Sequence, residues 1–411
     1  MQISLRKIKT SGWQDRLVFE NQRKILRREV GTCWQLVVQQ ADRVFYGDAA
    51  VVQYAGRCGR ATDNITLEDF GVTKMEGVLN SLFKQGLDFD DPRQAATLIE
   101  AGLSEINGLN ITAMMYGVSQ LLIQQYSADS KQEIPNYVLD LYQVQGTAAN
   151  SNTIEILSQT DNTNLAIVED MYKRGAHILP HANFCTADIA GLDLEHVRKY
   201  LASIVQILQA QQATKDTTLH LDLYGVIGDV CHMNKERVLN ILLELEALAT
   251  PFYRLQIESP VICDSQEEQY QYMQILSHEL KKQGSKVQLI IDEWCNSLDD
   301  IKQAVTMKVA DLAQIKVPDL GSLFNSIEAI LFCQKMGTKT YLGGTSNETM
   351  HSADISYLST IPFKPDQILA KPGMDPAVAI PFCQHKIQQC SDLLKTSQQG
   401  RLETSSIAQT V

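Results

Sequence analysis

Four ionisable residues stand at equivalent places in four successive short apolar segments. They are Asp222 in "HLDLYG", Glu258 in "LQIESP", Asp292 in "LIIDEW" and Lys316 in "AQIKVP". Successive side chains of a strand point to opposite faces, so each of these residues lies on the face opposite to its immediate neighbours. If the four segments are adjacent strands, three carboxylates and one amine would converge at one place.

Three converging carboxylates repel one another and are costly to bury unless a positive charge compensates them. Three carboxylates, waters and a substrate oxygen suit the octahedral coordination of Mg²⁺, so Asp222, Glu258 and Asp292 are the candidate metal ligands. A lysine near a bound cation and partly out of water has its ammonium form disfavoured. Lys316 is therefore a candidate base that works near neutral pH.

Each residue alone has a simpler interpretation. An acidic strand residue is commonly a surface carboxylate, and a lone lysine can protect an edge strand from aggregation. The order acid, acid, acid, lysine favours a site. His181 in "HILPHANF" is a candidate second acid or base, although a structural histidine fits the same pattern. His177 stands four residues earlier, about 13 Å away on a strand, so the two histidines cannot share one ion.

Further polar residues could bind a substrate. Gln159, at the end of the first apolar run, and Gln314, two residues before Lys316, could donate hydrogen bonds to a substrate carboxylate. The segment "GGTSNET" (343–349) could hold a carboxylate through Thr345 and Ser346, or it could be a simple turn.

The elements that must position these residues repeat along the second part of the chain. Eight short apolar runs, each followed by a helical stretch, occupy residues 153–159, 176–182, 219–225, 254–260, 287–294, 312–318, 338–344 and 367–373. Eight strand–helix units predict an α/β fold, a (β/α)₈ TIM-type barrel over residues 151–392. Barrel enzymes place their chemistry at the carboxyl ends of the strands, which is where the candidate residues stand.

The chain ends differ from this repeat. Residues 33–54 alternate like strands joined by a turn, and residues 91–128 have helical periodicity, so residues 1–150 are expected to form a separate α+β domain. The last segment, residues 393–411, is polar and aperiodic, and we expect a disordered tail.

Composition excludes several classes of partner. The 411 residues carry a net charge of −12 without a long basic run, so nucleic acid is not expected as a partner. We expect no signal peptide and no membrane span, because the N-terminus lacks an apolar core segment and the apolar runs are too short to cross a bilayer. Nine scattered cysteines without a C-x-x-C pair indicate reduced thiols and a cytoplasmic protein.

The motifs, taken in order, resemble those of the enolase superfamily, and of the methylaspartate ammonia-lyase family in particular. The segments that carry the resemblance are "LPHANF", "HLDLYGVIG", "IESPV", "DEWCN", "QIKVPDLG", "YLGGTSNET" and "LAKPGM". The segment "GDAAVVQYAGRCGR" (47–60) resembles the loop of that family's N-terminal α+β capping domain.

The resemblance implies an activity and roles for residues. The family eliminates ammonia reversibly from L-threo-3-methylaspartate to give mesaconate, through a Mg²⁺-stabilised enediolate, with K⁺ as an activator. Lys316 would remove the C3 proton and His181 would serve the epimeric substrate. The implied metal ligands are Asp222, Glu258 and Asp292, and the implied substrate contacts are Gln159, Gln314, Thr345, Ser346 and Leu369. A cytoplasmic homodimer that serves glutamate degradation is also implied.

The resemblance has departures, and rival functions stay open. Ser346 stands where the family usually has cysteine, Val317 stands where threonine is usual, and the opening segment matches poorly. The nearest rival is another enolase-type reaction on the same metal site: cycloisomerisation, racemisation or acid-sugar dehydration. Lys316 could instead form a Schiff base, as in aldolases. A non-catalytic protein that binds a dicarboxylate is the third alternative.

Overall fold

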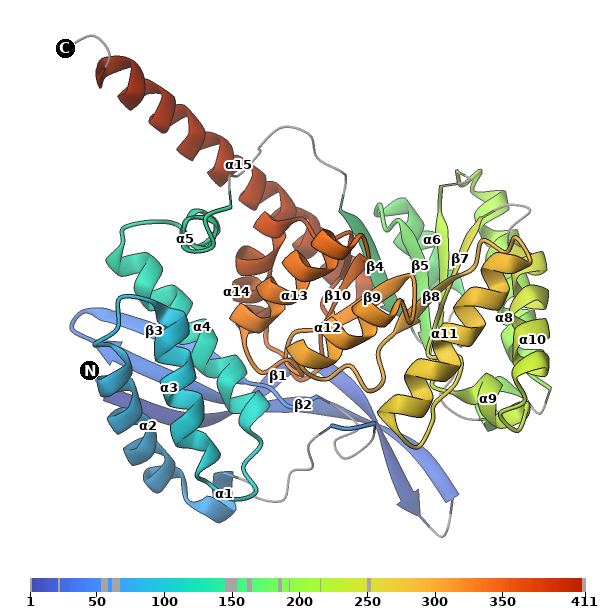
Figure 1. The fold of residues 1–411 in the computed structure, drawn as a ribbon, viewed down its shortest axis with the longest axis horizontal. Coiled ribbons are helices and arrows are strands. Elements are labelled where there is room, and N and C mark those ends of the chain that lie inside the picture. The colour runs from blue at the N-terminus through green and yellow to red at the C-terminus, as the bar shows by residue number, and fades with distance from the viewer. Residues whose placement is uncertain are drawn as a thin grey trace.

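The computed structural model describes residues 2–20, 23–52, 58–60, 67–144, 154–160, 165–183, 187–191, 193–214, 216–249 and 253–408. Two parts are visible in Figure 1: an N-terminal sheet with helices on one side, and a barrel surrounded by helices.

The barrel consists of eight parallel strands that close on themselves in the order β10-β11-β4-β5-β6-β7-β8-β9. Each of the eight apolar runs expected from the sequence overlaps one of these strands. Their bounds are Glu155–Thr160 (β4), Ile178–Asn183 (β5), Thr218–Asp222 (β6), Arg254–Glu258 (β7), Gln288–Ile291 (β8), Leu312–Lys316 (β9), Lys339–Gly343 (β10) and Gln367–Leu369 (β11).

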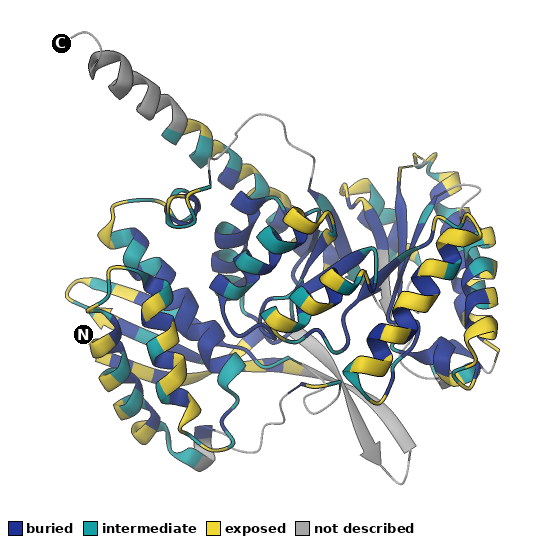
Figure 2. Ribbon diagram, viewed as in Figure 1, coloured by how far each residue is buried: buried dark blue, intermediate teal, exposed yellow. Residues whose placement is uncertain are grey.

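Helices follow the strands and cover the barrel. They are α6 (Ala166–Lys173), α7 (Ala187–Ala190), α8 (Glu195–Ala210), α9 (Val226–Val230), α10 (Lys235–Ala249), α11 (Gln266–Lys282), α12 (Leu298–Met307), α13 (Leu323–Met336), α14 (Met350–Thr360), η1 (Ile361–Phe363) and α15 (Pro376–Ala408). Side chains at their starts accept backbone N–H groups that have no partner within the helix, as Ser265 does for α11, Ser297 for α12 and Thr349 for α14. Figure 2 shows the strands buried, with exposed residues on the outer side of the helices.

The strands pack on both faces, which explains why their sequences are largely apolar. Leu219, Leu221 and Ile257 belong to the large core shared with the helices. A second, smaller cluster holds residues of six barrel strands, and we assign it to the barrel interior: Leu157, Ile178, Ile290, Leu312, Tyr341 and Leu369. Burial of both faces is the rule for parallel sheets.

The N-terminal part contains three antiparallel strands, β1 (Gln2–Glu20), β2 (Arg23–Gln40) and β3 (Arg43–Ala49). Its helices are α1 (Leu67–Phe70), α2 (Val72–Gly86), α3 (Pro92–Ser104), α4 (Ile111–Asp129) and α5 (Ile134–Leu141). Helix α4 packs directly on β3, where a Cβ at Gly47 would stand 2.0 Å from the carbonyl oxygen of Gly117. Glycine is therefore required at this close approach of two backbones.

The structure differs from the sequence expectation at the C-terminus. Residues 393–408, expected to be a disordered tail, continue α15, a helix of 33 residues that extends away from the barrel in Figure 1. The first part of α15 packs against the barrel, and a packed segment nucleates a helix that can then propagate without further apolar contacts. Among the described residues, no helix is both long and apolar enough to cross a membrane.

Candidate active site

The four residues that opened the sequence argument lie at the same end of the barrel. Asp222, Glu258 and Lys316 are the last residues of β6, β7 and β9, and Asp292 directly follows β8. Asp222 pairs in register with Glu258 across the two neighbouring strands. All three carboxylates are buried. Equal strand lengths in β6, β7 and β9 thus bring ionisable groups together that are far apart in the sequence.

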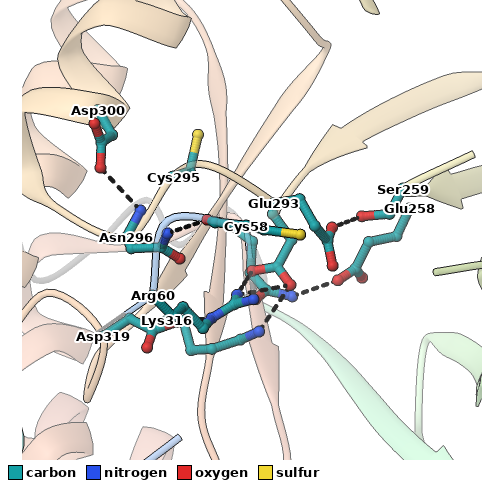
Figure 3. A network of polar contacts seen from close by, with 12 residues as sticks. Cys58, Arg60, Glu258, Ser259, Glu293, Cys295, Asn296, Asp300, Lys316 and Asp319 are labelled. Carbon is teal, nitrogen blue, oxygen red and sulfur yellow. Dashed lines mark hydrogen bonds and ion pairs between the residues drawn. The ribbon is translucent and has the colours of Figure 1, made fainter. Parts of the chain in front are cut away.

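Asp292 lies between two cationic side chains. Its Oδ2 accepts a hydrogen bond from Lys316 Nζ at 2.7 Å, and its Oδ1 lies 3.3 Å from Arg60 Nη2. Arg60 belongs to the N-terminal part of the chain, and its Nε also donates to Asp319 Oδ2 at 2.8 Å (Figure 3). The side chains of Arg60, Asp292 and Asp319 are each less than a tenth exposed. The N-terminal part therefore contributes a buried cation to the barrel site.

Glu258 is held by two neighbours inside the barrel. Its Oε2 lies 2.9 Å from His220 Nε2, and its Oε1 accepts a hydrogen bond from Gln314 Nε2 at 2.7 Å. Next to it, Ser259 Oγ donates a hydrogen bond to Glu293, a further buried carboxylate (Figure 3). The orientation of Glu258 is thus fixed by groups on β6 and β9.

Burial and mutual repulsion set the ionisation of these carboxylates. Burial, followed by the charges of Glu293 and Asp292, holds the pKa of Asp222 well above its ordinary value. Burial, followed by the charges of Asp222 and Asp292, does the same to the pKa of Glu258. At Asp292, burial raises the pKa, but Lys316 and Arg60 outweigh it, and the pKa is lowered. Asp222 and Glu258 therefore lack sufficient positive charge nearby.

The pKa of Lys316 shifts in the direction opposite to the one expected from the sequence. Burial alone would lower the pKa of this ammonium group, but the contact with Asp292 outweighs burial, and the pKa is raised. The expected lowering was based on burial and a nearby metal cation, whereas the ion pair with Asp292 acts in the opposite direction.

The donor set fits a divalent cation by charge, although not as a closed cage. Among the described side chains of the site, acidic groups outnumber the cationic ones, Lys316 and Arg60, if His220 is counted as neutral. The buried carboxylates are Asp222, Glu258, Asp292, Glu293 and Asp319. Within the described ranges, no three His, Cys, Asp or Glu side chains converge closely enough to ligate an ion. The oxygens of Glu258 and Asp292 point instead to protein donors. A site with an excess of carboxylate oxygens and of negative charge suits a hard cation such as Mg²⁺.

The other predicted residues lie at the same end of the barrel. Gln159 is half-buried on β4, and its backbone is in register with that of His181 on β5; the side chain of His181 lies outside the described residues. Thr345 and Ser346 are buried just after β10, and Leu369 is the last residue of β11.

Three residues next to the predicted metal ligands adopt the left-handed backbone conformation. They are Tyr224, Ser259 and Trp294, with φ of 44°, 46° and 64°. This conformation costs free energy for a residue with a side chain and persists where the surroundings enforce it, commonly at functional sites. At each of these strand ends the backbone turns sharply within two residues after the carboxylate.

Sequence reasoning missed four residues of the site: Arg60, His220, Glu293 and Asp319. Arg60 lies in the 47–60 segment that carried part of the resemblance, but its partner Asp292 is 232 residues away. His220 stands two residues before Asp222, on the same face of β6, and this alternation could have identified it. Glu293 and Asp319 follow strand ends in loops, where no periodicity applies.

Two family models together cover most of the chain. The model described as methylaspartate ammonia-lyase C-terminus matches residues 148–392, and the one described as methylaspartate ammonia-lyase N-terminus matches residues 23–143. Methylaspartate ammonia-lyase 2 from Carboxydothermus hydrogenoformans is 30% identical over 375 residues, which are 90% of this chain and 88% of that protein.

Solved structures agree with this result. The Citrobacter amalonaticus methylaspartate ammonia-lyase containing (2S,3S)-3-methylaspartic acid has a TM-score of 0.81 and 26% identity, covering 96% of this chain and 99% of that one. The Mg complex of β-methylaspartase from Clostridium tetanomorphum has a TM-score of 0.76 and 24% identity, with coverage of 97% and 99%. The expected fold, a (β/α)₈ barrel with an N-terminal α+β part, is confirmed. On the strength of these matches, the chain belongs to the methylaspartate ammonia-lyase family of carbon–nitrogen lyases.

Proposed function

We propose that this chain is a Mg²⁺-dependent ammonia-lyase that converts L-threo-3-methylaspartate reversibly to mesaconate and ammonia. The observation that carries the proposal is the Lys316–Asp292 contact of 2.7 Å among buried carboxylates at the carboxyl end of the barrel. Two facts about relatives support it: the Citrobacter structure contains 3-methylaspartic acid, and the Clostridium structure is a Mg complex.

The reaction begins with removal of a proton from a very weakly acidic C–H group. The C3 proton lies next to a carboxylate, and its removal places a second negative charge on that group. Lys316 Nζ, in its neutral form, accepts the proton, and the C3–H electron pair is delocalised into the adjacent carboxylate. This electron pair then forms the C2=C3 double bond as the C2–N bond of the substrate ammonium group breaks with its electrons on nitrogen, and ammonia leaves. Asp222, Glu258 and Asp292 would hold Mg²⁺, which supplies positive charge to the substrate carboxylate when bound.

Lys316 must first leave its ion pair, because the contact with Asp292 keeps it protonated. Once Asp292 is engaged elsewhere, burial is the dominant influence on this lysine, and burial favours the neutral amine. Asp292 thus controls the protonation of the base.

Residues on the other strands would bind and orient the substrate. We propose that Gln314 donates the second hydrogen of its amide, since the first is engaged with Glu258. His181, on β5, would face the opposite side of the substrate and act on the epimer. The remaining proposed contacts are Gln159, Thr345, Ser346 and Leu369.

An absorbance assay at 240 nm tests the function. We expect mesaconate to form from L-threo-3-methylaspartate in the presence of Mg²⁺, and activity to be lost in EDTA and restored by Mg²⁺. K⁺ is expected to increase the rate. Activity that is indifferent to EDTA, or trapping of a carbonyl substrate on Lys316 by borohydride, would contradict the proposal. Turnover of other amino acids or acid sugars, without mesaconate, would indicate another enolase-type reaction.

Further properties follow from the family and are part of the proposal. The division into a capping domain (residues 1–150) and a catalytic barrel (residues 151–392) is supported by the two matches, which meet between residues 143 and 148. A cytoplasmic homodimer acting in glutamate degradation is proposed from the family resemblance alone. Sedimentation of the purified protein would test the dimer.

A further inference from the structure

Two buried ionisable side chains that the proposed reaction does not use lie at the 343–349 loop. Lys371, two residues after β11, is 1% exposed, and Glu348 is 4% exposed. Burying an ionisable group is costly unless hydrogen bonds compensate it, so both positions require a reason. Both residues bond the backbone of Thr345, one of the proposed substrate contacts.

The backbone N–H and the backbone carbonyl group of Thr345 are hydrogen-bonded to two different side chains. Its N–H donates to Glu348 Oε2 at 2.8 Å, and its carbonyl oxygen accepts from Lys371 Nζ at 3.3 Å. Lys371 Nζ is itself held by the carbonyl oxygen of Pro372 at 2.9 Å. Both peptide units that flank Thr345 are therefore fixed in orientation.

The side chain of Thr345 remains able to serve a ligand. Its Oγ1 accepts a long hydrogen bond of 3.4 Å from the N–H of Asn347 and donates to no group that the structure describes. The hydroxyl proton is thus available to an acceptor such as a carboxylate. A fixed backbone then determines where this proton points.

The N-terminal part of the chain anchors Glu348 and the loop. Tyr116, a buried residue of α4, donates from its hydroxyl to Glu348 Oε1 at 2.6 Å. A Cβ at position 344 would stand 2.5 Å from Glu348 Oε2, so the glycine leaves room for this carboxylate. Thr10 of β1 also donates to the carbonyl oxygen of Ser346 at 3.2 Å. The loop is therefore set by both parts of the chain.

We propose that Lys371 and Glu348 are positioning residues that fix the Thr345 peptide so that its hydroxyl is presented to the substrate carboxylate, an inference that rests on the proposed function. They act through Thr345 and do not touch the reacting atoms. We call the hydrogen bonds between the Thr345 backbone and the side chains of Lys371 and Glu348 the clamp. Loss of the clamp weakens substrate binding more than it slows the chemistry, because Lys316 and the carboxylates at the ends of β6–β8 stay in place.

Steady-state kinetics of Lys371→Met test the proposal. This change keeps most of the volume and removes the hydrogen bond to Thr345. We expect KM for 3-methylaspartate to rise about tenfold, with kcat falling less than about threefold. The matched control is Lys386→Met, since Lys386 is also buried and paired, with Asp354 at 2.7 Å, but on α15. It should leave KM unchanged. A purely structural role predicts lower kcat from inactive protein at constant KM, and that result would overturn the proposal.

Two substitutions of Glu348 separate the charge from the hydrogen bond. Glu348→Gln keeps an oxygen that accepts the Thr345 N–H, so KM should stay within about threefold of the wild type, whereas Glu348→Leu should raise it about tenfold. Equal effects of both changes would contradict the clamp. If Lys371→Met does not fold, Tyr116→Phe, which removes only one hydroxyl, should raise KM about threefold.

Amide hydrogen exchange keeps the proposal testable apart from the reaction. Exchange of the Thr345 N–H should accelerate in Lys371→Met and Glu348→Leu and remain unchanged in Lys386→Met. If the wild type forms no mesaconate, the proposed function fails, and protection of this amide still decides whether the clamp exists. Unchanged protection in both loop variants overturns the inference.

Discussion

Two lysines at the same end of the barrel, Lys316 partly buried and Lys371 fully buried, behave in opposite ways. Lys316 has Asp292 Oδ2 at 2.7 Å, and this contact outweighs burial and raises its pKa. Lys371 bonds carbonyl oxygens of Thr345 and Pro372, and burial lowers its pKa to about 8 against the weaker attraction of Glu348. A direct carboxylate contact therefore decides the direction of the shift: it favours the charged form of Lys316, whereas burial favours the neutral form of Lys371. Lys316 has to lose its carboxylate contact before it can accept a proton, and Lys371 is hydrogen-bonded to backbone carbonyl groups.

The largest expected effect comes from removing the first lysine. Lys316→Ala should lower kcat for L-threo-3-methylaspartate by about 10³-fold, because no other described amine lies at Asp292 to accept the C3 proton. Formation of mesaconate at 240 nm measures the loss. Mg²⁺ should still bind, which isothermal titration can check. A variant that keeps a tenth or more of the activity would remove Lys316 from the role of base.

Removing the second cation at Asp292 tests how the ion pair is held. Arg60→Met leaves Asp319 without its buried cation and Asp292 with Lys316 alone, so the free energy of unfolding should fall by about 3 kcal/mol. Urea unfolding measures the change. The control is Arg43→Met, whose pair with Asp129 is exposed and is expected to contribute less than about 1 kcal/mol. Similar losses in the two variants would show that the Arg60 contacts contribute little.

The second lysine should make stability depend on pH. Its folded pKa of about 8 lies below the unfolded value of 10.5, so the unfolded chain binds more protons between these values and stability rises with pH. From pH 7 to pH 9.5 this rise is about 2 kcal/mol, since 1.5 units above pH 8 contribute 1.36 kcal/mol each. Urea unfolding of the wild type and of Lys371→Met at both pH values isolates the contribution of Lys371 to this change in the free energy of unfolding. Parallel pH profiles would mean that the folded pKa of Lys371 is not lowered, so that the lysine keeps its proton up to pH 9.5.

The smallest effect is expected at the loop that the second lysine holds. Ser346→Cys places the residue usual in the family beside Thr345. A larger, less polar side chain should lower KM for 3-methylaspartate about threefold and leave kcat unchanged. Aspartate, which lacks the methyl group, serves as the control substrate and should show no gain. An equal gain for both substrates would argue against contact between this residue and the methyl group.

The fold could be predicted because its signal is local. Strands such as "HLDLYG" and "LAQIKVP" are bounded apolar runs separated by helical stretches, and eight such units leave few alternatives to a closed barrel. The C-terminal helix was missed for the same reason. Residues 393–408 have no apolar period, and their helix is continued from the packed start of α15.

The site could be predicted only in part. Alternation placed Asp222, Glu258 and Lys316 at one end of the barrel, because each stands on the polar face at the carboxyl end of its strand, and parallel strands share that end. Arg60 could not be identified as a site residue, because its contact with Asp292 joins positions 232 residues apart and no local pattern near Arg60 indicates it. The direction of the Lys316 shift depends on a single contact of 2.7 Å, and a sequence does not contain that distance.

The Arg60–Asp292 contact has a consequence for synthesis on the ribosome. Arg60 emerges 232 residues before Asp292, so this cation stays in water until its two carboxylate partners have been translated. The buried contacts of the catalytic centre can therefore form only late in synthesis, after Asp319 has been added. Their completion can be followed by the protection of Arg60 from chemical modification.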